Sequence, residues 1–273
     1  MQTVKGLWVS GKGRDDKLPP LAALCAKSFL DNGFAFELYT YEPLCNIPSG
    51  VQVCDASTII PERDVYRTLE RDSLCNFSDW FRCELLYKHG GIWSDMDNVC
   101  LKHKQVPDIY TVQNDPTERK ACLGVASALK GSPMMQMLAR VSDPGYELPW
   151  YTYELCELCK EIREEFPDIK ERRIHGRWGL LNPDVVQRTC NYYGVRAYPS
   201  DEAYPIPYGA FNMLYDSGGK RLMESTLFEN AWCVHMYGEM CRKFPKVGNN
   251  RCADSVLSIL AHKHAVSVEG ALS

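Results

Sequence analysis

Apolar and polar positions along the first part of the chain predict strands separated by a helix. Residues 6–10, 34–41 and 51–55 are short, largely apolar runs of the kind that form strands, and the apolar positions of residues 19–32 have helical spacing. A strand, a loop and a helix in this order open an α/β unit. We therefore expect an α/β fold.

The second half of the chain has a less regular pattern. Residues 108–112 and 121–130 are predicted strands, and residues 133–141 and 153–166 are predicted helices. Near the end, a hydrophobic run leads into His235 and Tyr237. Strands and helices therefore continue to alternate beyond the first half.

The most informative stretch lies between these halves, at residues 77–101. Ser78 is a candidate N-cap for a helix over residues 79–89, which Gly90 and Gly91 end. A short apolar strand over residues 92–94 follows, and its carboxyl end leads into Asp95 and Asp97. Residues two apart in an extended segment point to the same side, so both carboxylates are expected to lie together.

The residue types in this stretch suit a charged, polyhydroxylated ligand. Asp79 and Arg82 stand three apart on the predicted helix and so share a face, where Arg82 offers a fork of donors and Asp79 offers acceptors for hydroxyls. The carboxylates of Asp95 and Asp97 suit a hard divalent cation that keeps positions open for phosphate oxygens. A nucleoside-diphosphate ligand would use both features.

Composition narrows the classes of protein to consider. The 273 residues are 45% hydrophobic and 24% charged, as in an ordinary globular protein, and the net charge of −4 without a basic run argues against nucleic-acid binding and a polybasic membrane patch. The N-terminus lacks the apolar core of a signal peptide, and no stretch approaches the length of a transmembrane helix. We expect a cytoplasmic protein, with the inner face of a membrane as one option. The alternative is a chain whose membrane anchor has been removed.

The cysteine content raises a separate question. Thirteen cysteines cannot all pair internally, and their scatter through helical and strand-like segments favours reduced, mostly buried thiols. Cys156 and Cys159 form the one close pair, on a predicted helix and without a second pair at zinc-site spacing. Thiols on a helix are favoured over a zinc site, although a secreted protein could form disulfides.

The pattern of residues 77–101 resembles that of glycosyltransferase family 32, which includes yeast-type α-mannosyltransferases and α1,4-galactosyltransferases, and of the glucosyltransferase domains of large clostridial toxins. An isolated Asp-X-Asp would carry no information, but here it is part of a long pattern, with Trp93 in place of the usual tyrosine. The matching positions are Ser78, Asp79, Arg82, Leu86, Tyr87, Gly90, Gly91, Asp95 and Asp97.

The resemblance implies a GT-A fold, with a central mixed sheet flanked by helices in a single domain of residues 1–273. Residues 1–110 would form the nucleotide-sugar-binding half and residues 111–273 the acceptor-side half. It implies a metal-dependent, retaining transfer of a sugar from a nucleoside-diphosphate donor, UDP favoured, to a saccharide or glycolipid acceptor in surface-glycan synthesis. From charge and hydropathy we expect no nucleic-acid partner and no transmembrane segment, with peripheral membrane association as an option.

The resemblance also assigns roles to residues. Catalysis is assigned to Asp95, Asp97 and Arg82, and metal binding to Asp97, Asp95 and His235. Donor binding is assigned to Trp8, which would stack on uracil, and to Ser10, Asp79, Arg82 and Asp95. Because manganese accepts imidazole more readily than magnesium does, His235 favours Mn²⁺, with Mg²⁺ as the alternative.

Further candidates and other functions stay open. Gly179 and Asn182 lie in a degenerate form of a segment that lines the acceptor side in relatives, and Asn114 or Asp115 could face the sugar, although a plain turn is favoured there. The alternatives to a transferase of glycans are an inactive nucleotide-sugar or glycan-binding protein, a toxin-like transferase acting on protein, and a zinc or redox module built on the cysteines.

Overall fold

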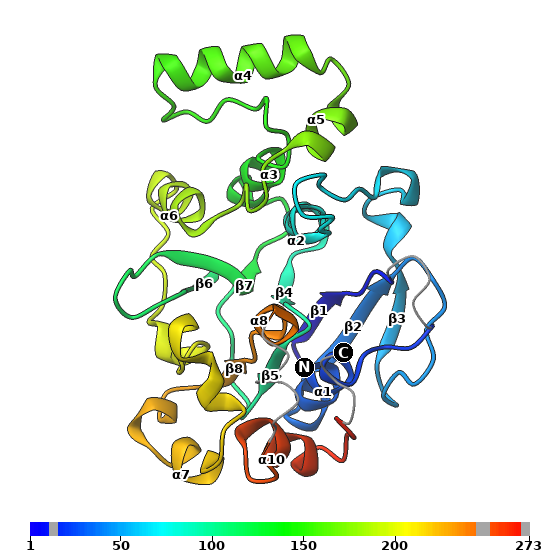
Figure 1. Cartoon of the computed structure of the whole chain (residues 1–273), viewed down its shortest axis with the longest axis vertical. Coiled ribbons are helices and arrows are strands. Elements are labelled where there is room, and N and C mark those ends of the chain that lie inside the picture. Colours follow the sequence, from blue (N-terminus) through cyan, green and yellow to red (C-terminus); the bar gives the residue numbers. More distant parts are fainter. Residues whose placement is uncertain (11–15, 244–251, 269–273) are drawn as a thin grey trace. The chain divides into compact units, whose positions relative to one another are not determined.

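The computed structural model describes residues 1–10, 16–243 and 252–268 (Figure 1). Its contacts group into two compact units built from alternating stretches of the chain. The first comprises residues 1–55, 91–127 and 197–273, and the second comprises residues 56–90 and 128–196. Both units draw on residues before and after position 110, and the single-domain organisation stays a prediction.

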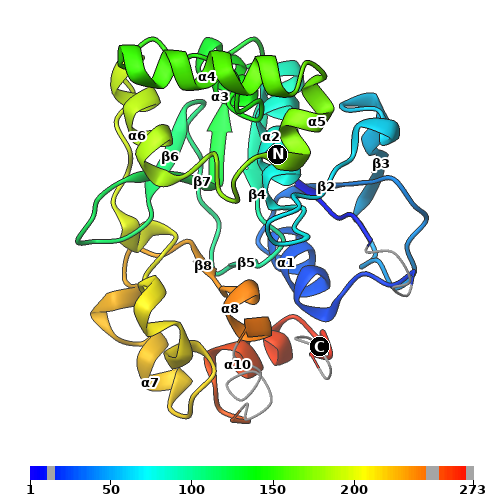
Figure 2. The ribbon, with the colours of Figure 1, turned by 45° about the horizontal axis from the view of Figure 1, so that its top comes forward.

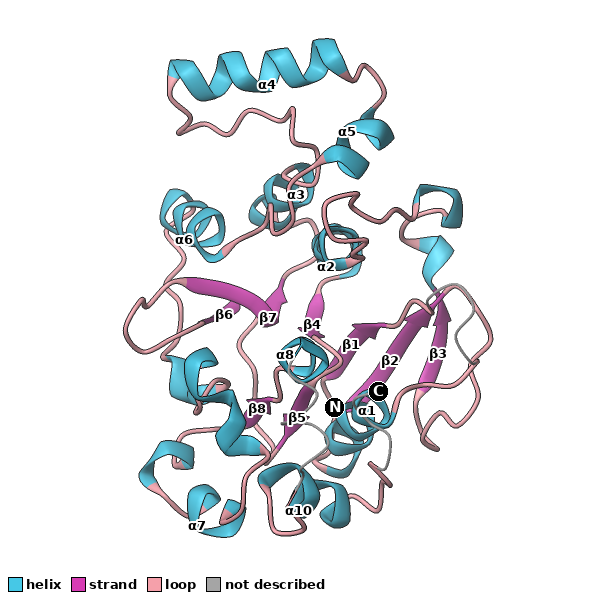
Figure 3. Cartoon of the chain, in the orientation of Figure 1, coloured by secondary structure: helices cyan, strands magenta, loops and turns pink. Residues whose placement is uncertain are grey.

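The first unit is built around a six-stranded sheet (Figure 3). Its order is β3-β2-β1-β4-β7-β6, with β1 parallel to β2 and β4, β2 parallel to β3, and β6 antiparallel to β7. These strands are β1 (Thr3–Leu7), β2 (Ala35–Thr40), β3 (Gln52–Asp55), β4 (Gly91–Ser94), β6 (Tyr110–Gln113) and β7 (Ala121–Ala128). The prediction of an α/β fold with a mixed central sheet is confirmed.

A second, two-stranded sheet of the first unit pairs β5 (Asn98–Cys100) with β8 (Cys233–His235) in antiparallel register. Helix α1 (Pro20–Asp31) packs against β5 and β2, and α1 lies beside β5 in both Figure 1 and Figure 2. Buried apolar side chains of α1 and the strands form one core with the C-terminal segments. Those segments are η3 (Ser200–Glu202), η4 (Tyr208–Leu214), α7 (Gly219–Met223), η5 (Thr226–Phe228), α8 (Gly238–Lys243) and α10 (Val256–Lys263).

The second unit is helical. Helices α2 (Cys75–His89) and α3 (Pro133–Arg140) pack together, and α3 buries Met134, Met135, Met137 and Leu138. The other elements are η1 (Ala56–Thr58), η2 (Glu62–Asp64), α4 (Tyr153–Glu165), α5 (Ile169–His175) and α6 (Pro183–Tyr192). Within the described residues, none of the helices has both the length and the apolar character needed to span a membrane.

Two predicted boundaries are wrong in ways that affect the candidate residues. Strand β1 ends at Leu7, so Trp8 and Ser10 follow the strand instead of lying in it. Helix α2 begins at Cys75 after Leu74, without a side-chain cap, so Ser78 lies inside the helix and is not its N-cap. The Ser73 hydroxyl accepts a hydrogen bond from the Cys75 amide at 3.1 Å, which satisfies one of the amides left open at this end.

Candidate functional site

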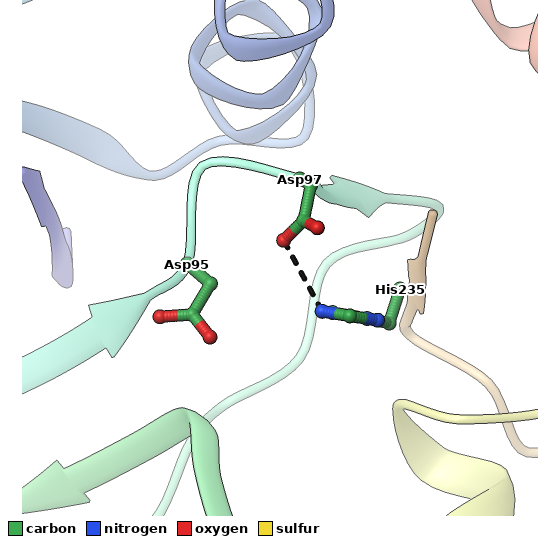
Figure 4. Close-up of side chains that lie close together, drawn as sticks. All are labelled: Asp95, Asp97 and His235. Carbon is green, nitrogen blue, oxygen red and sulfur yellow. Dashed lines mark ion pairs between the residues drawn. The ribbon is translucent and has the colours of Figure 1, made fainter. Parts of the chain in front are cut away.

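Two carboxylates and one imidazole converge in the first unit (Figure 4). Asp95 follows β4, Asp97 precedes β5, and His235 ends β8. One ligand atom from each residue lies within 4.8 Å of the other two, and no other group of this kind occurs in the described part of the chain. The three residues predicted to bind a metal therefore lie together, and their role as ligands stays a prediction.

The β5–β8 pairing explains how His235 reaches the aspartates. Asn98 is opposite His235 in the register, and the Met236 amide donates to the Asp97 carbonyl at 2.8 Å. The His235 amide donates to the Ala203 carbonyl at 3.2 Å. The backbone amides of His235 and of the next residue, Met236, are therefore both hydrogen-bonded. A strand that is distant in sequence thus delivers His235 to the turn that carries the two carboxylates.

The Asp97 carboxylate has a defined neighbour on each oxygen. Its Oδ1 lies 3.2 Å from His235 Nε2, and its Oδ2 accepts a hydrogen bond from the Gly238 amide at 2.9 Å. The side chains of His235 and Asp97 are 17% and 24% exposed, so both are mostly buried but open to a ligand. Asp97 can therefore offer Oδ1 to a cation while Oδ2 stays on the backbone.

Asp95 is held through both its backbone and its side chain. Its amide donates to the Gly124 carbonyl at 2.7 Å, and its carbonyl accepts from the Asn98 amide at 3.1 Å. The indole N–H of Trp93 donates to Asp95 Oδ1 at 2.8 Å. A Cβ placed on Gly124 would lie 3.1 Å from Asp95 Oδ2, so the second oxygen faces the strand that carries Gly124.

Two buried tyrosines complete the surroundings of His235. The rings of Tyr204 and Tyr237 lie 5.3 and 4.5 Å from the imidazole, centroid to centroid. Burial raises the pKa of both phenols above the usual value, with a smaller contribution from Asp95 at Tyr204 and from Asp97 at Tyr237. Both hydroxyls are therefore protonated at neutral pH. Sequence reasoning missed Tyr204 and Gly124, because neither belongs to a motif.

The donor set fits a divalent cation. Two carboxylates and an imidazole are the hard and borderline ligands that Mn²⁺ accepts. Two ligands of one ion are at most about twice the 2.0–2.6 Å metal–oxygen bond length apart, and the three candidate atoms lie within 4.8 Å of one another. The residues Asp95, Asp97 and His235 would hold the ion. Three protein ligands leave coordination positions for phosphate oxygens.

The residues proposed for the nucleobase lie at the end of β1. The Trp8 amide donates to the Tyr39 carbonyl at 2.9 Å, and the half-buried indole packs against the core. The Ser10 hydroxyl is buried without a hydrogen-bond partner among the described residues. These positions put Trp8 and Ser10 just beyond a strand end, and their donor-binding roles stay predictions.

Asp79 and Arg82 belong to the second unit. As predicted, they share a face of α2, but they bind each other, with Arg82 Nη2 2.6 Å from Asp79 Oδ1 and side chains only 9% and 13% exposed. Each charge is therefore compensated by the other within α2. Their binding of a sugar or a ribose stays a prediction.

Three of the four further candidates, Gly179, Asn182 and Asp115, have local structural roles. Asn182 caps α6 by accepting from the amides of Asp184 and Val185. Gly179 has a positive φ of 75°, and its amide donates to Asn76 at 2.8 Å. Asp115 accepts from the amides of Thr117 and Glu118, so the favoured turn at Asn114 and Asp115 is confirmed.

No disulfide joins two of the cysteines that the structure describes, which include the helical Cys156 and Cys159. Burial raises the pKa of Cys25, Cys100 and Cys233, which are fully enclosed in the core of the first unit. Six of the twelve described cysteines are buried, five are partly buried and one is exposed, so the expectation of mostly buried thiols is met for half of them. A thiol-rich metal cluster is absent among the described residues.

Comparisons with known proteins identify the region around the aspartates. Residues 55–115 match a family model described as "Glycosyltransferase sugar-binding region containing DXD motif". The matched residues include Asp79, Arg82, Asp95 and Asp97 and end well before His235. No curated protein matches the chain by sequence.

Solved structures of glycosyltransferases show a low overall similarity. PaToxG glycosyltransferase is 11% identical over 70% of this chain and 69% of its own, with a TM-score of 0.45. LgtC, a galactosyltransferase in complex with donor and acceptor sugar analogues, is 9% identical over 91% and 96%, with a TM-score of 0.40. GlyE of Streptococcus pneumoniae TIGR4 is 10% identical over 86% and 54%, with a TM-score of 0.42.

The membership of family 32 in particular stays a prediction, because the matched model is defined by the sugar-binding region alone. That region contains both aspartates of the DXD motif at the positions predicted from the sequence. Residues 55–115 are the DXD-containing sugar-binding region of a glycosyltransferase, and the chain is an enzyme of this class.

Proposed function

We propose that this glycosyltransferase depends on a divalent metal, Mn²⁺ or alternatively Mg²⁺, and has the GT-A type of fold. One observation carries the proposal: Asp95, Asp97 and His235 lie within 4.8 Å of one another. The two aspartates are in the matched DXD region, and His235 is outside it. A bound divalent cation supplies charge neutralisation for the diphosphate that leaves the sugar.

The surrounding residues define what the protein itself does in the reaction. Asp97 Oδ1 and His235 Nε2 are already 3.2 Å apart and mostly shielded from water, so little reorganisation is needed before a ligand binds. Asp95 is fixed by the Trp93 indole and by two backbone hydrogen bonds. Fixed ligands of this kind orient the donor diphosphate for transfer.

The donor is a UDP-sugar in this proposal, and Trp8 stacks on its base with Ser10 as a polar contact. Asp79 and Arg82 bind the hydroxyls of the donor sugar and ribose, and Arg82 is counted among the catalytic residues. The transfer retains the anomeric configuration, and the acceptor is a saccharide or glycolipid of a surface glycan. A cytoplasmic location at the inner face of a membrane belongs to the same proposal.

A thermal-stability experiment tests the metal and the nucleotide together. The wild-type protein is melted with UDP or GDP, each with Mn²⁺ or with a chelator. A nucleotide at 100 times its dissociation constant adds about 2.7 kcal/mol, which corresponds to roughly 5–10 °C for a protein of this size. We expect a rise with UDP only when Mn²⁺ is present.

The matched variants are Asp97→Ala and Asp108→Ala, the second at an exposed aspartate of the same unit. Asp97→Ala should abolish the Mn²⁺-dependent rise and lower turnover at least about 100-fold, whereas Asp108→Ala should behave as the wild type. A rise with GDP alone would change the donor, and equal shifts in Asp97→Ala and the wild type would remove the metal-site assignment. Hydrolysis of a panel of UDP-sugars separates an active enzyme from a binding protein.

A further inference from the structure

Trp93 is almost completely buried, with 1% exposure, in the strand that leads into the candidate metal site. It stands two residues before Asp95, so the two side chains leave the extended chain on the same side. An indole N–H can only donate a hydrogen bond, and a buried donor needs an acceptor. That acceptor is Asp95 Oδ1, at 2.8 Å.

The Trp93 hydrogen bond restrains the Asp95 carboxylate, which the backbone hydrogen bonds of Asp95 leave free to rotate. The Asp95 amide and carbonyl are fixed by Gly124 and Asn98, so the remaining freedom is rotation of the carboxylate. The indole holds Oδ1, which directs Oδ2 to the other side, where a Cβ on Gly124 would approach it to 3.1 Å. The bond joins a neutral donor to a charged acceptor, which is the stronger kind of hydrogen bond.

Asp97 shows the same division between its two oxygens. Its Oδ2 is held by the Gly238 amide at 2.9 Å, while its Oδ1 lies 3.2 Å from His235 Nε2. Each carboxylate therefore has one oxygen on a protein donor, and each also has an oxygen within 4.8 Å of the other candidate ligand atoms. The donor is a backbone amide for Asp97 and a side chain for Asp95, so only the second can be removed by a substitution of the donor residue.

We propose that Trp93 is a positioning residue of the metal site, which makes Asp95 a ligand through one oxygen by holding the other. The inference rests on the proposed metal-dependent function. Outer hydrogen-bond partners of metal ligands typically contribute 10–100-fold to metal affinity. We therefore expect Trp93→Phe, which keeps an aromatic ring and removes the N–H, to weaken Mn²⁺ binding by that factor.

The control is Trp232→Phe in the same unit. Trp232 is also 1% exposed, and its indole donates at 2.9 Å to the Tyr110 hydroxyl, which is not a ligand candidate. Both variants lose one buried indole hydrogen bond, so a loss of stability alone would affect them alike. Only Trp93→Phe should weaken Mn²⁺ binding by 10-fold or more, with Trp232→Phe within about 3-fold of the wild type.

The experiment measures free Mn²⁺ by electron paramagnetic resonance during titration of the full chain without nucleotide, and the melting temperature of each variant without metal. Trp93→Tyr, which restores a hydroxyl donor, serves as the rescue variant and should bind Mn²⁺ more tightly than Trp93→Phe. Equal Mn²⁺ affinity in Trp93→Phe and wild type overturns this inference alone. If the wild type binds no Mn²⁺, the proposed metal dependence fails first.

If Trp93→Phe does not fold, Trp93→Tyr is compared directly with Trp232→Phe. The tyrosine hydroxyl restores a donor but not at the position of the indole N–H, so the rescue is only partial and this variant should still bind Mn²⁺ more weakly than Trp232→Phe does. Affinities equal to that of the wild type in both would contradict the positioning role of Trp93.

Discussion

Gly124 is the position where a single added methyl group would test the packing of the site most directly. A Cβ there would lie 2.2 Å from the Tyr204 hydroxyl oxygen and 3.1 Å from Asp95 Oδ2. The first distance is far inside van der Waals contact, and Tyr204 is buried at 6% exposure. Gly124→Ala must therefore displace the phenol, the carboxylate or the strand.

Overpacking of this kind typically costs about 1–3 kcal/mol. For a protein of this size, each kcal/mol corresponds to roughly 2–4 °C in the melting temperature, so we expect a fall of about 2–12 °C. Because Asp95 Oδ2 must also move by some tenths of an ångström, Mn²⁺ affinity should fall with stability. Calorimetry of the metal-free protein and a Mn²⁺ titration measure the two effects.

A second substitution shows whether the stated contact is the cause. Tyr204→Phe removes the clashing oxygen, and the next atom of that ring, Cζ, would be 3.5 Å from the new Cβ, an ordinary contact. The double variant should therefore be more stable than the sum of the single effects predicts, by about 1 kcal/mol or more. Mn²⁺ binding should recover less, because the 3.1 Å approach to Asp95 remains.

The matched control is Gly209→Ala, since a Cβ on Gly209 meets nothing within 4 Å. This variant should be as stable as the wild type or slightly more so, because alanine restricts the unfolded chain. The reasoning would be refuted if Gly124→Ala melted and bound Mn²⁺ as the wild type does. Strictly additive effects of Gly124→Ala and Tyr204→Phe would also refute it.

Two further predictions concern charged pairs away from the candidate ligands. Arg82→Met should lower the unfolding free energy by roughly 3–5 kcal/mol, measured in urea, because it removes the cation that is ion-paired with the 13%-exposed Asp79 carboxylate; a loss below about 1 kcal/mol would contradict this. Burial lowers the pKa of His264, which is hydrogen-bonded to Asp31 at 2.9 Å and near Lys27 and Lys263, below its ordinary value of 6.5. The unfolded chain therefore takes up a proton first, so stability should fall as the pH drops below about 6.5. His264→Gln should show a smaller fall between pH 7.5 and 5.5, and an unchanged pH dependence would refute the assignment.

The sequence predicted the helices in which the spacing of apolar residues matches the buried face and the capping residues mark the ends. Helix α1 was expected over residues 19–32 and occupies Pro20–Asp31, because a proline at its first turn and a run of buried apolar residues favour the same boundaries. The expected helix over residues 153–166 corresponds to Tyr153–Glu165 for similar reasons, with Thr152 as its N-cap. The proximity of Asp95 and Asp97 was also predictable, since they flank one turn.

Other features depend on tertiary contacts that no local pattern records. Strand β5 has only the residues Asn98–Cys100 and exists because β8 pairs with it. The start of α2 was misplaced because Ser78 looks like a cap, whereas the helix begins one turn earlier at Cys75. Tyr204 comes to the site through the fold of a segment rich in prolines, without a helical or strand pattern.

The β5–β8 pairing also bears on when the site can form during folding. The Asp97 carboxylate and the Gly238 amide that binds it are 141 positions apart in sequence, so their contact closes a long loop of chain. Closing a loop of that length costs about 4 kcal/mol of entropy by a simple chain estimate. His235 cannot reach Asp95 and Asp97 until that loop has closed. The complete set of candidate ligands therefore forms late and does not act as the folding nucleus. A cation that needs all three side chains would slow unfolding of the finished protein more than it would speed folding.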